Sequence, residues 1–293
     1  MADPAKDVLH LEEDGASAAI TRLGAEPVSW RVSGRELLWS GDPQHWARHA
    51  PILFPVVGAS AGGAVRVGAQ SYPMPQHGFA RDSHFAVVER DRDAAQLRLI
   101  ETDETWTHYP FRFVLDVTVT LGPDSLALVF EVTNTDTSDM PYALGFHPAF
   151  PWPFDAGDRR GHAVEFQREE NAKVPGITDA GLLAEGGRRL PLDGDRLPLD
   201  PKLFTGALAF LDAKSRSMRF RSPSDAAIEM EVDDFPHLAL WTKPDAPFLS
   251  LEAWTGHADP DGFSGDLFER PSMRRLPLGH SARHRVTLRW LHA

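Results

Sequence analysis

Hydrophobic and polar residues alternate with a period of two along much of the chain. The pattern is clearest in residues 111–121 and 126–133, which flank the turn Gly122-Pro123-Asp124. Because successive side chains of a strand point to opposite faces, this pattern predicts a β-hairpin with one buried face. Shorter segments of the same kind predict strands at residues 85–90, 97–101, 217–221, 227–233, 237–243 and 284–291.

Helical periodicity is almost absent, and only residues 42–49 are compatible with one short helical turn. Many short strands separated by turn residues predict an all-β sandwich or barrel. No shift in composition marks a boundary, so a single domain over residues 1–293 is expected. Residues 171–202 are rich in Gly, Pro, Asp and Arg, which predicts a long loop over the surface.

Composition narrows the possible functions. The 293 residues carry a net charge of −12, which disfavours nucleic acid and anionic membranes as partners. Cysteine is absent, which excludes disulfides, thiolate metal sites and a cysteine nucleophile. The polar N-terminus does not resemble a signal peptide, and no apolar segment is long enough to span a bilayer. A cytoplasmic location is therefore expected.

The segment Phe248–Gly256 holds the first candidate for chemistry. As a strand it directs Leu249, Leu251 and Ala253 to one face and Glu252 with Trp254 to the other. A carboxylate beside a large aromatic side chain is a common arrangement for holding a sugar ring, and such a glutamate can act as a general base.

A second candidate is His147, in the segment Tyr142–Phe150. Alternation places Gly145 and His147 opposite Phe146, and small neighbours leave room for a ligand. Pro148 favours the end of the strand at this point. From this motif alone, a ligand-facing histidine and a core histidine bonded to a carbonyl are equally compatible.

Three further features have mainly structural interpretations. His77 and Arg81 lie in an irregular segment, Pro75–Asp82, in which the histidine is expected to cap a backbone carbonyl. Residues 50–58 are apolar but twice interrupted by proline, which predicts an edge strand or an irregular stretch under the sheet, with a mainly structural role. The pairs His45/His49 and His280/His284 have zinc-ligand spacing but no supporting context, so no metal is expected.

Taken together, the motifs resemble those of a known family. His77-Gly78-Phe79-Ala80-Arg81, Gly145–Phe150 and Trp241–Pro244 followed by Leu251–Trp254 occur in the order found in the aldose 1-epimerase (galactose mutarotase-like) family, in its LacX-like branch. The N-terminal stretch from Gly24 to Pro55, with Pro51-Ile52-Leu53-Phe54-Pro55 at its end, is also similar to that branch. The resemblance covers nearly the whole chain and implies a large antiparallel β-sandwich with a sugar site on a concave face.

The resemblance also implies roles for individual residues. His147 would be the general acid and Glu252 the general base in the interconversion of α and β anomers of a hexose, without a cofactor. His77 and Arg81 would hold sugar oxygens. Trp241 or Trp254 could stack on the sugar, with at least one of them in the sheet core, and Lys243 could bond a hydroxyl. A small sugar is the expected partner, for a monomer or a homodimer.

Ordinary pKa values of ~6.5 for histidine and ~4.3 for glutamate would make the first a ready acid and the second an ionised base. The two side chains are expected to flank the sugar from opposite sides.

The chain departs from the family pattern at two positions, which keeps alternatives open. Ala59 stands where the branch commonly has arginine, and Gly206 stands where the family usually has an aspartate that binds sugar hydroxyls. Asp212 could take over that role. One alternative is a hexose-6-phosphate 1-epimerase, with a phosphate held by Arg48, Arg66 and Arg81. The other is a non-catalytic carbohydrate-binding protein, which the loss of the aspartate would favour.

Overall fold

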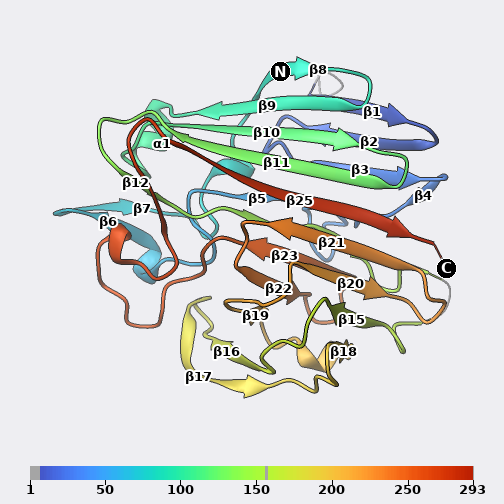
Figure 1. The fold of residues 1–293 in the computed structure, drawn as a ribbon. Coiled ribbons are helices and arrows are strands. Elements are labelled where there is room, and N and C mark those ends of the chain that lie inside the picture. Colours follow the sequence, from blue (N-terminus) through green and yellow to red (C-terminus); the bar gives the residue numbers. More distant parts are fainter. Residues whose placement is uncertain (1–6, 156–157, 293) are drawn as a thin grey trace.

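The computed structural model describes residues 7–155 and 158–292, and two large antiparallel sheets dominate it (Figure 1). The polar N-terminal residues 1–6, which argued against a signal peptide, lie outside the described part. The nine-stranded sheet has the order β18-β15-β20-β21-β25-β11-β10-β9-β8. Its strands are β8 (Ala86–Arg90), β9 (Ala94–Ile100), β10 (Phe113–Leu121), β11 (Ser125–Asn134), β15 (Ala163–Phe166), β18 (Arg196–Pro198), β20 (Ser217–Arg221), β21 (Ala227–Asp233) and β25 (Ser281–Leu291).

The six-stranded sheet has the order β19-β22-β23-β13-β5, with β14 also paired to β23. Its strands are β5 (Ile52–Leu53), β13 (Gly145–Phe146), β14 (Ala149–Pro151), β19 (Leu208–Phe210), β22 (His237–Trp241) and β23 (Phe248–Trp254). Strand β5 lies at the edge of this sheet, which confirms the edge position predicted from the two prolines.

The remaining elements among the described residues are smaller sheets and short helices. A four-stranded sheet contains β1 (Val8–Glu13), β2 (Ala16–Thr21), β3 (Pro27–Val32) and β4 (Arg35–Glu36). Three two-stranded pairs are β6 (Ala64–Val67) with β7 (Gln70–Pro73), β12 (Met140–Tyr142) with β24 (Arg274–Leu276), and β16 (Lys173–Ile177) with β17 (Leu183–Arg189). Helical structure is limited to α1 (Asp103–Trp106) and 3₁₀ turns at Ala61–Gly63, Ala80–Asp82, Pro201–Leu203 and Leu267–Glu269. The all-β prediction is confirmed.

The predicted hairpin is β10 with β11, paired from Phe113 opposite Asn134 to Leu121 opposite Leu126. Burial alternates along the whole of β11, as the period-two pattern requires. The other predicted strands correspond to β8, β9, β20, β21, β22 and β25.

Residues 42–49 contain the one short turn that the sequence allows: the Trp46 N–H donates to the Asp42 carbonyl, four residues back, at 2.8 Å, and the chain then continues irregularly. One prediction of local structure needs correction. Residues 171–202 are not one long loop, because they contain the hairpin β16–β17 and strand β18. A bulge between Val174 and Gly176 breaks the alternation of β16, which hid the strand from pattern analysis.

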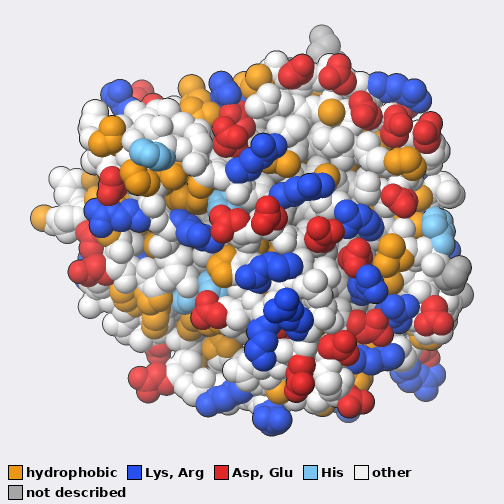
Figure 2. Space-filling view, viewed as in Figure 1, with side chains coloured by type: hydrophobic (Ala, Val, Ile, Leu, Met, Phe, Trp, Pro, Cys, Tyr) orange, Lys and Arg blue, Asp and Glu red, His pale blue; other side chains and the backbone are white. Residues whose placement is uncertain are grey.

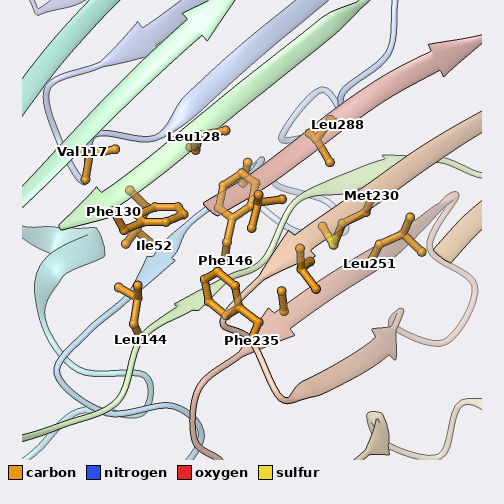
Figure 3. Packing of buried hydrophobic residues seen from close by; sticks show 14 of the residues in the cluster. Ile52, Val117, Leu128, Phe130, Leu144, Phe146, Met230, Phe235, Leu251 and Leu288 are labelled. Carbon is orange, nitrogen blue, oxygen red and sulfur yellow. The ribbon is translucent and has the colours of Figure 1, made fainter. Parts of the chain in front are cut away.

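The hydrophobic core lies between the two large sheets (Figure 3). Leu128 and Phe130 of the nine-stranded sheet face Phe146 and Leu251 of the six-stranded sheet, and all four side chains are fully buried. Burying such a side chain contributes about 1.5–3 kcal/mol. Because alternate residues of β23 face the core, the core packing directs Glu252 to the opposite face of the six-stranded sheet.

The outer face of the nine-stranded sheet is covered by charges of both signs, visible where these strands lie in Figure 2. Cross-strand pairs join Arg98 to Asp116 at 2.7 Å and Arg219 to Glu229 at 2.8 Å. Over the described ranges, no helix combines the length and apolar character that a bilayer crossing requires.

Candidate active site

A cleft of about 330 Å³ opens on the face of the six-stranded sheet that is turned away from the core. Its volume falls within the range of about 300–1,000 Å³ that is typical of small-molecule sites. The lining residues are Trp46, Val57, Gly58, Gln76, His77, Arg81, His147, Ile177, Gly181, Leu183, Gly206, Ala207, Trp241, Lys243, Glu252, Trp254 and Ala258. The cleft therefore brings together all six side chains that were predicted from the sequence to be catalytic or substrate-binding.

Glu252 and His147 are in direct contact at the base of the cleft. Strand β23 supplies Glu252, and its partner β13 ends just before His147, whose N–H donates to the Pro51 carbonyl at 3.1 Å. His147 Nε2 lies 3.2 Å from Glu252 Oε1. The expectation that they flank a sugar from opposite sides is therefore wrong: they lie side by side and reach the cleft from one wall.

Neighbouring side chains fix both members of this pair. The Trp254 indole N–H donates to Glu252 Oε2 at 2.9 Å. The Ser250 hydroxyl lies 3.1 Å from His147 Nδ1. The imidazole thus contacts a hydroxyl and a carboxyl and lines the cleft, which favours the ligand-facing interpretation over a histidine enclosed in the core.

Burial changes the acidity of both groups. Desolvation lowers the pKa of His147 to about 3, and the nearby cations Arg81 and Arg48 act in the same direction. Desolvation raises the pKa of Glu252 to about 8, although the hydrogen bond from Trp254 opposes the rise. The expectation of ordinary pKa values for a separate acid and base is therefore wrong. At neutral pH the pair holds one proton between its two members and titrates as a unit.

His77 faces His147 across the cleft, with ring centroids 6.0 Å apart. Its backbone has a left-handed φ of 69°, as the irregular segment suggested. The Gly58 N–H donates to His77 Nδ1 at 3.1 Å, so the ring accepts a backbone donor and does not cap a carbonyl as expected. Burial lowers the pKa of His77 well below its usual value. The neutral ring must carry its proton on Nε2, which makes that atom a donor.

The three arginines proposed for a phosphate do not meet at one site, although Arg48 and Arg81 lie together: both pair with Asp82, and Arg48 donates to the Arg81 carbonyl at 3.3 Å. Arg81 lines the cleft and donates to the Gln76 carbonyl at 2.6 Å, while Arg48 pairs with Asp82 at 2.8 Å. Arg66 lines a different cavity, where it bonds the Ser264 carbonyl. The arrangement predicted for this alternative is therefore absent.

Aromatic rings form another wall of the cleft. The centroids of Trp46 and Trp241 lie 5.0 and 5.3 Å from that of His147. The Lys243 ammonium donates to the His45 carbonyl at 2.9 Å at the rim. Trp241 and Trp254 both line the cleft, and Trp254 is also buried in a small hydrophobic cluster, which confirms that at least one of the two belongs to the core.

Comparison with known proteins agrees with this architecture. The family model for aldose 1-epimerase matches residues 7–253. The chain belongs to the aldose 1-epimerase family. Membership assigns the protein to a family of isomerases and confirms the family resemblance inferred from the sequence.

Individual relatives cover almost the full chain. The protein LacX of Lactococcus lactis subsp. lactis is 32% identical over 287 residues, which span 93% of this chain and 96% of LacX. A galactose mutarotase-like protein from Lactobacillus casei has a TM-score of 0.91 at 31% identity, covering 97% of this chain and 100% of the relative. A galactose mutarotase related enzyme from Lactobacillus acidophilus has a TM-score of 0.88 at 26% identity, covering 97% of each chain.

Several residues of this aldose 1-epimerase family member escaped the sequence analysis. Arg270 is buried beneath the cleft, where it pairs with Asp259 at 2.9 Å and donates to the carbonyls of Val57 and His257 at 2.8 Å each. It thereby fixes the backbone on both sides of Gly58, whose N–H orients His77. Residues 50–58 are therefore not merely structural. Because 213 positions separate Arg270 from Val57, no local pattern could have indicated this contact.

The wall near Gly206 lacks the carboxylate that the family pattern led us to expect. Ile177 and Leu183 of the β16–β17 hairpin form this wall with Gly206 and Ala207. Asp212 does not replace the aspartate, because it does not line the cleft and its side chain is 91% exposed.

The described residues contain no group of three or more His, Asp or Glu side chains placed to hold a metal ion. His49 instead contacts the Ser40 carbonyl at 3.1 Å, and His284 lies 2.9 Å from the Tyr142 hydroxyl.

Proposed function

We propose that the protein is a cofactor-independent aldose 1-epimerase that interconverts the α and β anomers of a hexose. The main support is the contact between His147 Nε2 and Glu252 Oε1 in the wall of an aromatic cleft. In a cyclic aldose, the anomeric hydroxyl and the ring oxygen are both bonded to C1. An acid and a base that lie side by side can therefore serve both oxygens at once.

The reaction needs only proton transfers around the C1–O5 bond. Glu252, as the base, takes the proton of the C1 hydroxyl, and His147, as the acid, gives its Nε2 proton to O5 while the C1–O5 bond breaks. The aldehyde rotates about C1–C2, and the reverse transfers close the ring on the other face. The pair holds one proton before and after each opening. Each positioned acid or base contributes about 10²–10⁴-fold in rate.

The ionised form of the pair, carboxylate with imidazolium, is the reactive form in this assignment. Burial favours the neutral form, with the proton on Glu252, in the free protein. The two forms have the same net charge and differ only in whether one proton is on His147 Nε2 or on Glu252 Oε1, which lie 3.2 Å apart. The Trp254 N–H stabilises the carboxylate, and the two sugar oxygens add hydrogen-bonding partners.

The remaining groups can hold the sugar. His77 Nε2, Arg81 and Lys243 are donors for hydroxyl oxygens, and Trp46 or Trp241 offers a ring face for the apolar side of the sugar. We keep a small sugar as the partner, a cytoplasmic location and a monomeric or homodimeric single-domain protein as predictions.

Anomer-exchange NMR tests the proposal. Wild-type protein should speed the exchange of glucose or galactose anomers in proportion to its concentration, above the buffer rate. Tight sugar binding without any acceleration over a panel of neutral and acidic aldoses would instead establish the non-catalytic carbohydrate-binding alternative.

A further inference from the structure

Ser250 contacts the imidazole of His147 at the nitrogen that does not face Glu252. Its hydroxyl lies 3.1 Å from His147 Nδ1, while Glu252 Oε1 lies 3.2 Å from Nε2. Ser250 is fully buried and does not line the cleft. Within the described ranges, this contact is the one hydrogen bond that its side chain makes. The reaction proposed above uses the histidine but gives this serine no task.

One strand supplies both partners of the imidazole ring. Ser250 and Glu252 are two residues apart in β23, so their side chains point to the same face of the sheet and lie about 7 Å apart along the strand. The contacts at both nitrogens show that the ring spans the two side chains. A shift of one residue in strand register would turn both groups into the core, so the register that positions Glu252 also positions Ser250.

The protons held by the pair require an acceptor at His147 Nδ1. When the shared proton is on Glu252, this carboxyl donates to Nε2, so the neutral ring carries its own proton on Nδ1. When the shared proton has moved to Nε2, the imidazolium carries protons on both nitrogens. Nδ1 is therefore a donor in both forms, and the Ser250 oxygen is the side-chain acceptor within reach. Without an acceptor, a buried N–H group is unfavourable.

A hydroxyl suits this position because it can also donate. Once the pair has lost its shared proton, Nε2–H faces the Glu252 carboxylate and Nδ1 becomes an acceptor. Rotation about the Cβ–Oγ bond of Ser250 then turns the O–H toward Nδ1. A carboxylate in place of the serine would instead favour a permanent imidazolium. The serine thus supports the ring of His147 without fixing its charge.

The same contact determines which ring atom faces the sugar. A half-turn of the ring would put Cδ2 in the place of Nδ1 and Cε1 in the place of Nε2, and a C–H group cannot give the proton to O5. In the free protein, Ser250 and Glu252 both hold the ring. During ring opening, Nε2 gives its proton to O5 and Glu252 takes the proton of the C1 hydroxyl. The hydrogen bond to Ser250 then keeps Nε2 directed toward the sugar.

We propose that Ser250 is a positioning residue, which accepts the Nδ1–H of His147 and thereby reserves Nε2 for proton transfer to the sugar. This inference rests on the proposed function and deepens it. The backbone carbonyl of His147 is a competing acceptor, since a backbone hydrogen bond of this residue opposes the fall in its pKa. The inference assigns the main role to the serine hydroxyl, and removal of that hydroxyl separates the two acceptors.

The test compares Ser250→Ala with a matched control, Ser215→Ala. Ser215 is equally buried, its hydroxyl bonds the N–H and the carbonyl of Arg168, and it does not line the cleft. In Ser250→Ala, kcat for anomer exchange should fall about tenfold with KM unchanged, because the lost hydrogen bond acts on the ring and not on the bound sugar. The control should keep both constants. Ser250→Thr, which retains a hydroxyl, should recover part of kcat.

Nitrogen NMR of the imidazole gives a second readout, which does not need turnover. The signals of His147 are assigned by their absence in His147→Ala. In the wild-type protein near neutral pH, Nδ1 should be protonated. In Ser250→Ala, the form with Nδ1–H should lose population to the form with Nε2–H, because Nδ1–H loses its acceptor whereas Nε2–H keeps Glu252 as a partner.

The outcomes separate this inference from the proposed function. An unchanged kcat, or an unchanged tautomer of His147, in folded Ser250→Ala would overturn the inference and assign the role to the backbone carbonyl. An equal loss of kcat in Ser215→Ala would also reject it. If the wild-type protein turns over no sugar, the proposed function fails, and the tautomer of His147 still decides whether the serine holds the ring. Thermal unfolding verifies the fold, and Ser250→Cys, with its weak thiol acceptor, replaces an alanine variant that does not fold.

Discussion

Two regions of the molecule bring a cationic or basic group against a carboxyl group, with opposite consequences. On the outer face of the nine-stranded sheet, Arg98 lies 2.7 Å from Asp116, and the arginine side chain is 43% exposed. In the cleft, His147 lies 3.2 Å from Glu252, with side chains only 8% and 2% exposed. Water reaches the Arg98 guanidinium, and its two hydrogen bonds at 2.7 and 2.8 Å stabilise the Asp116 carboxylate, whose side chain is only 11% exposed. The second pair has no such exposed cation, and burial shifts it toward its neutral form. Burial, more than contact, thus allows a pair to exchange protons near neutral pH.

The same strand geometry produces both pairs. In β10, the outward residue Asp116 lies between the core residues Leu115 and Val117, and in β23 Glu252 lies between Leu251 and Ala253. The difference comes from what covers each face. The partly exposed Arg98 side chain covers Asp116, whereas loops with several aromatic side chains cover Glu252.

The largest expected effect follows from removing either member of the buried pair. His147→Ala or Glu252→Gln should lower the enzyme-dependent rate of anomer exchange by at least about 100-fold, because each change removes one proton-transfer group. Polarimetry of freshly dissolved sugar measures the rate, and circular dichroism checks the fold. A folded variant with wild-type activity would show that the pair is not the site of proton transfer.

The pH dependence of anomer exchange tests whether the buried pair, unlike the pair on the outer sheet, titrates near neutral pH. The raised pKa of Glu252, about 8, marks the loss of the one proton that the pair holds. Activity should therefore fall as pH rises through about 8, since a deprotonated pair has no acid to protonate the ring oxygen. Rates measured from pH 6 to 10, and corrected for the buffer-catalysed reaction, test this fall in activity.

Trp254→Phe tests whether the hydrogen bond to Glu252 helps to set the pH at which activity falls. It keeps an aromatic ring but removes the indole N–H that favours the carboxylate, so the pKa of Glu252 should rise further. The alkaline fall in activity should then move to higher pH. A shift in the other direction would contradict a role for burial and hydrogen bonding in setting this pKa.

The smallest effect is expected on the outer sheet. Asp116→Asn should cost about 1–3 kcal/mol of unfolding free energy, because it weakens a two-point, charge-assisted contact with Arg98, and it should not change anomer exchange. Urea denaturation measures the first quantity and NMR the second. A large loss of activity would mean that the outer face communicates with the cleft.

Structural features that depend on neighbouring residues could be predicted from the sequence, whereas features that depend on irregular backbone or distant residues could not. The hairpin β10–β11 is encoded in neighbouring residues, so alternation revealed it. The β16–β17 hairpin was missed because a bulge and the glycines at 176, 186 and 187 interrupt its pattern. Short strands β1 to β4 were missed as well, although Leu9 and Leu11 of β1 and Trp30 and Val32 of β3 alternate with polar residues.

The candidate site shows the same limit. Family motifs nominated His147 and Glu252, but their contact depends on the pairing of β13 with β23, which no sequence period specifies. Their shifted pKa values depend on burial by distant segments. Arg270 carries no local signal, because its contacts exist only once the cleft has assembled, whereas alternation along β23 already places Ser250 on the face of Glu252.

The pairing of β16 with β17 has a practical consequence. These two strands form a sheet of their own, so they share no ladder with either large sheet. A library that varies or replaces this hairpin could reshape the part of the cleft distant from C1 while leaving the strands that carry the proton-transfer pair untouched. Engineering for new sugars should begin there.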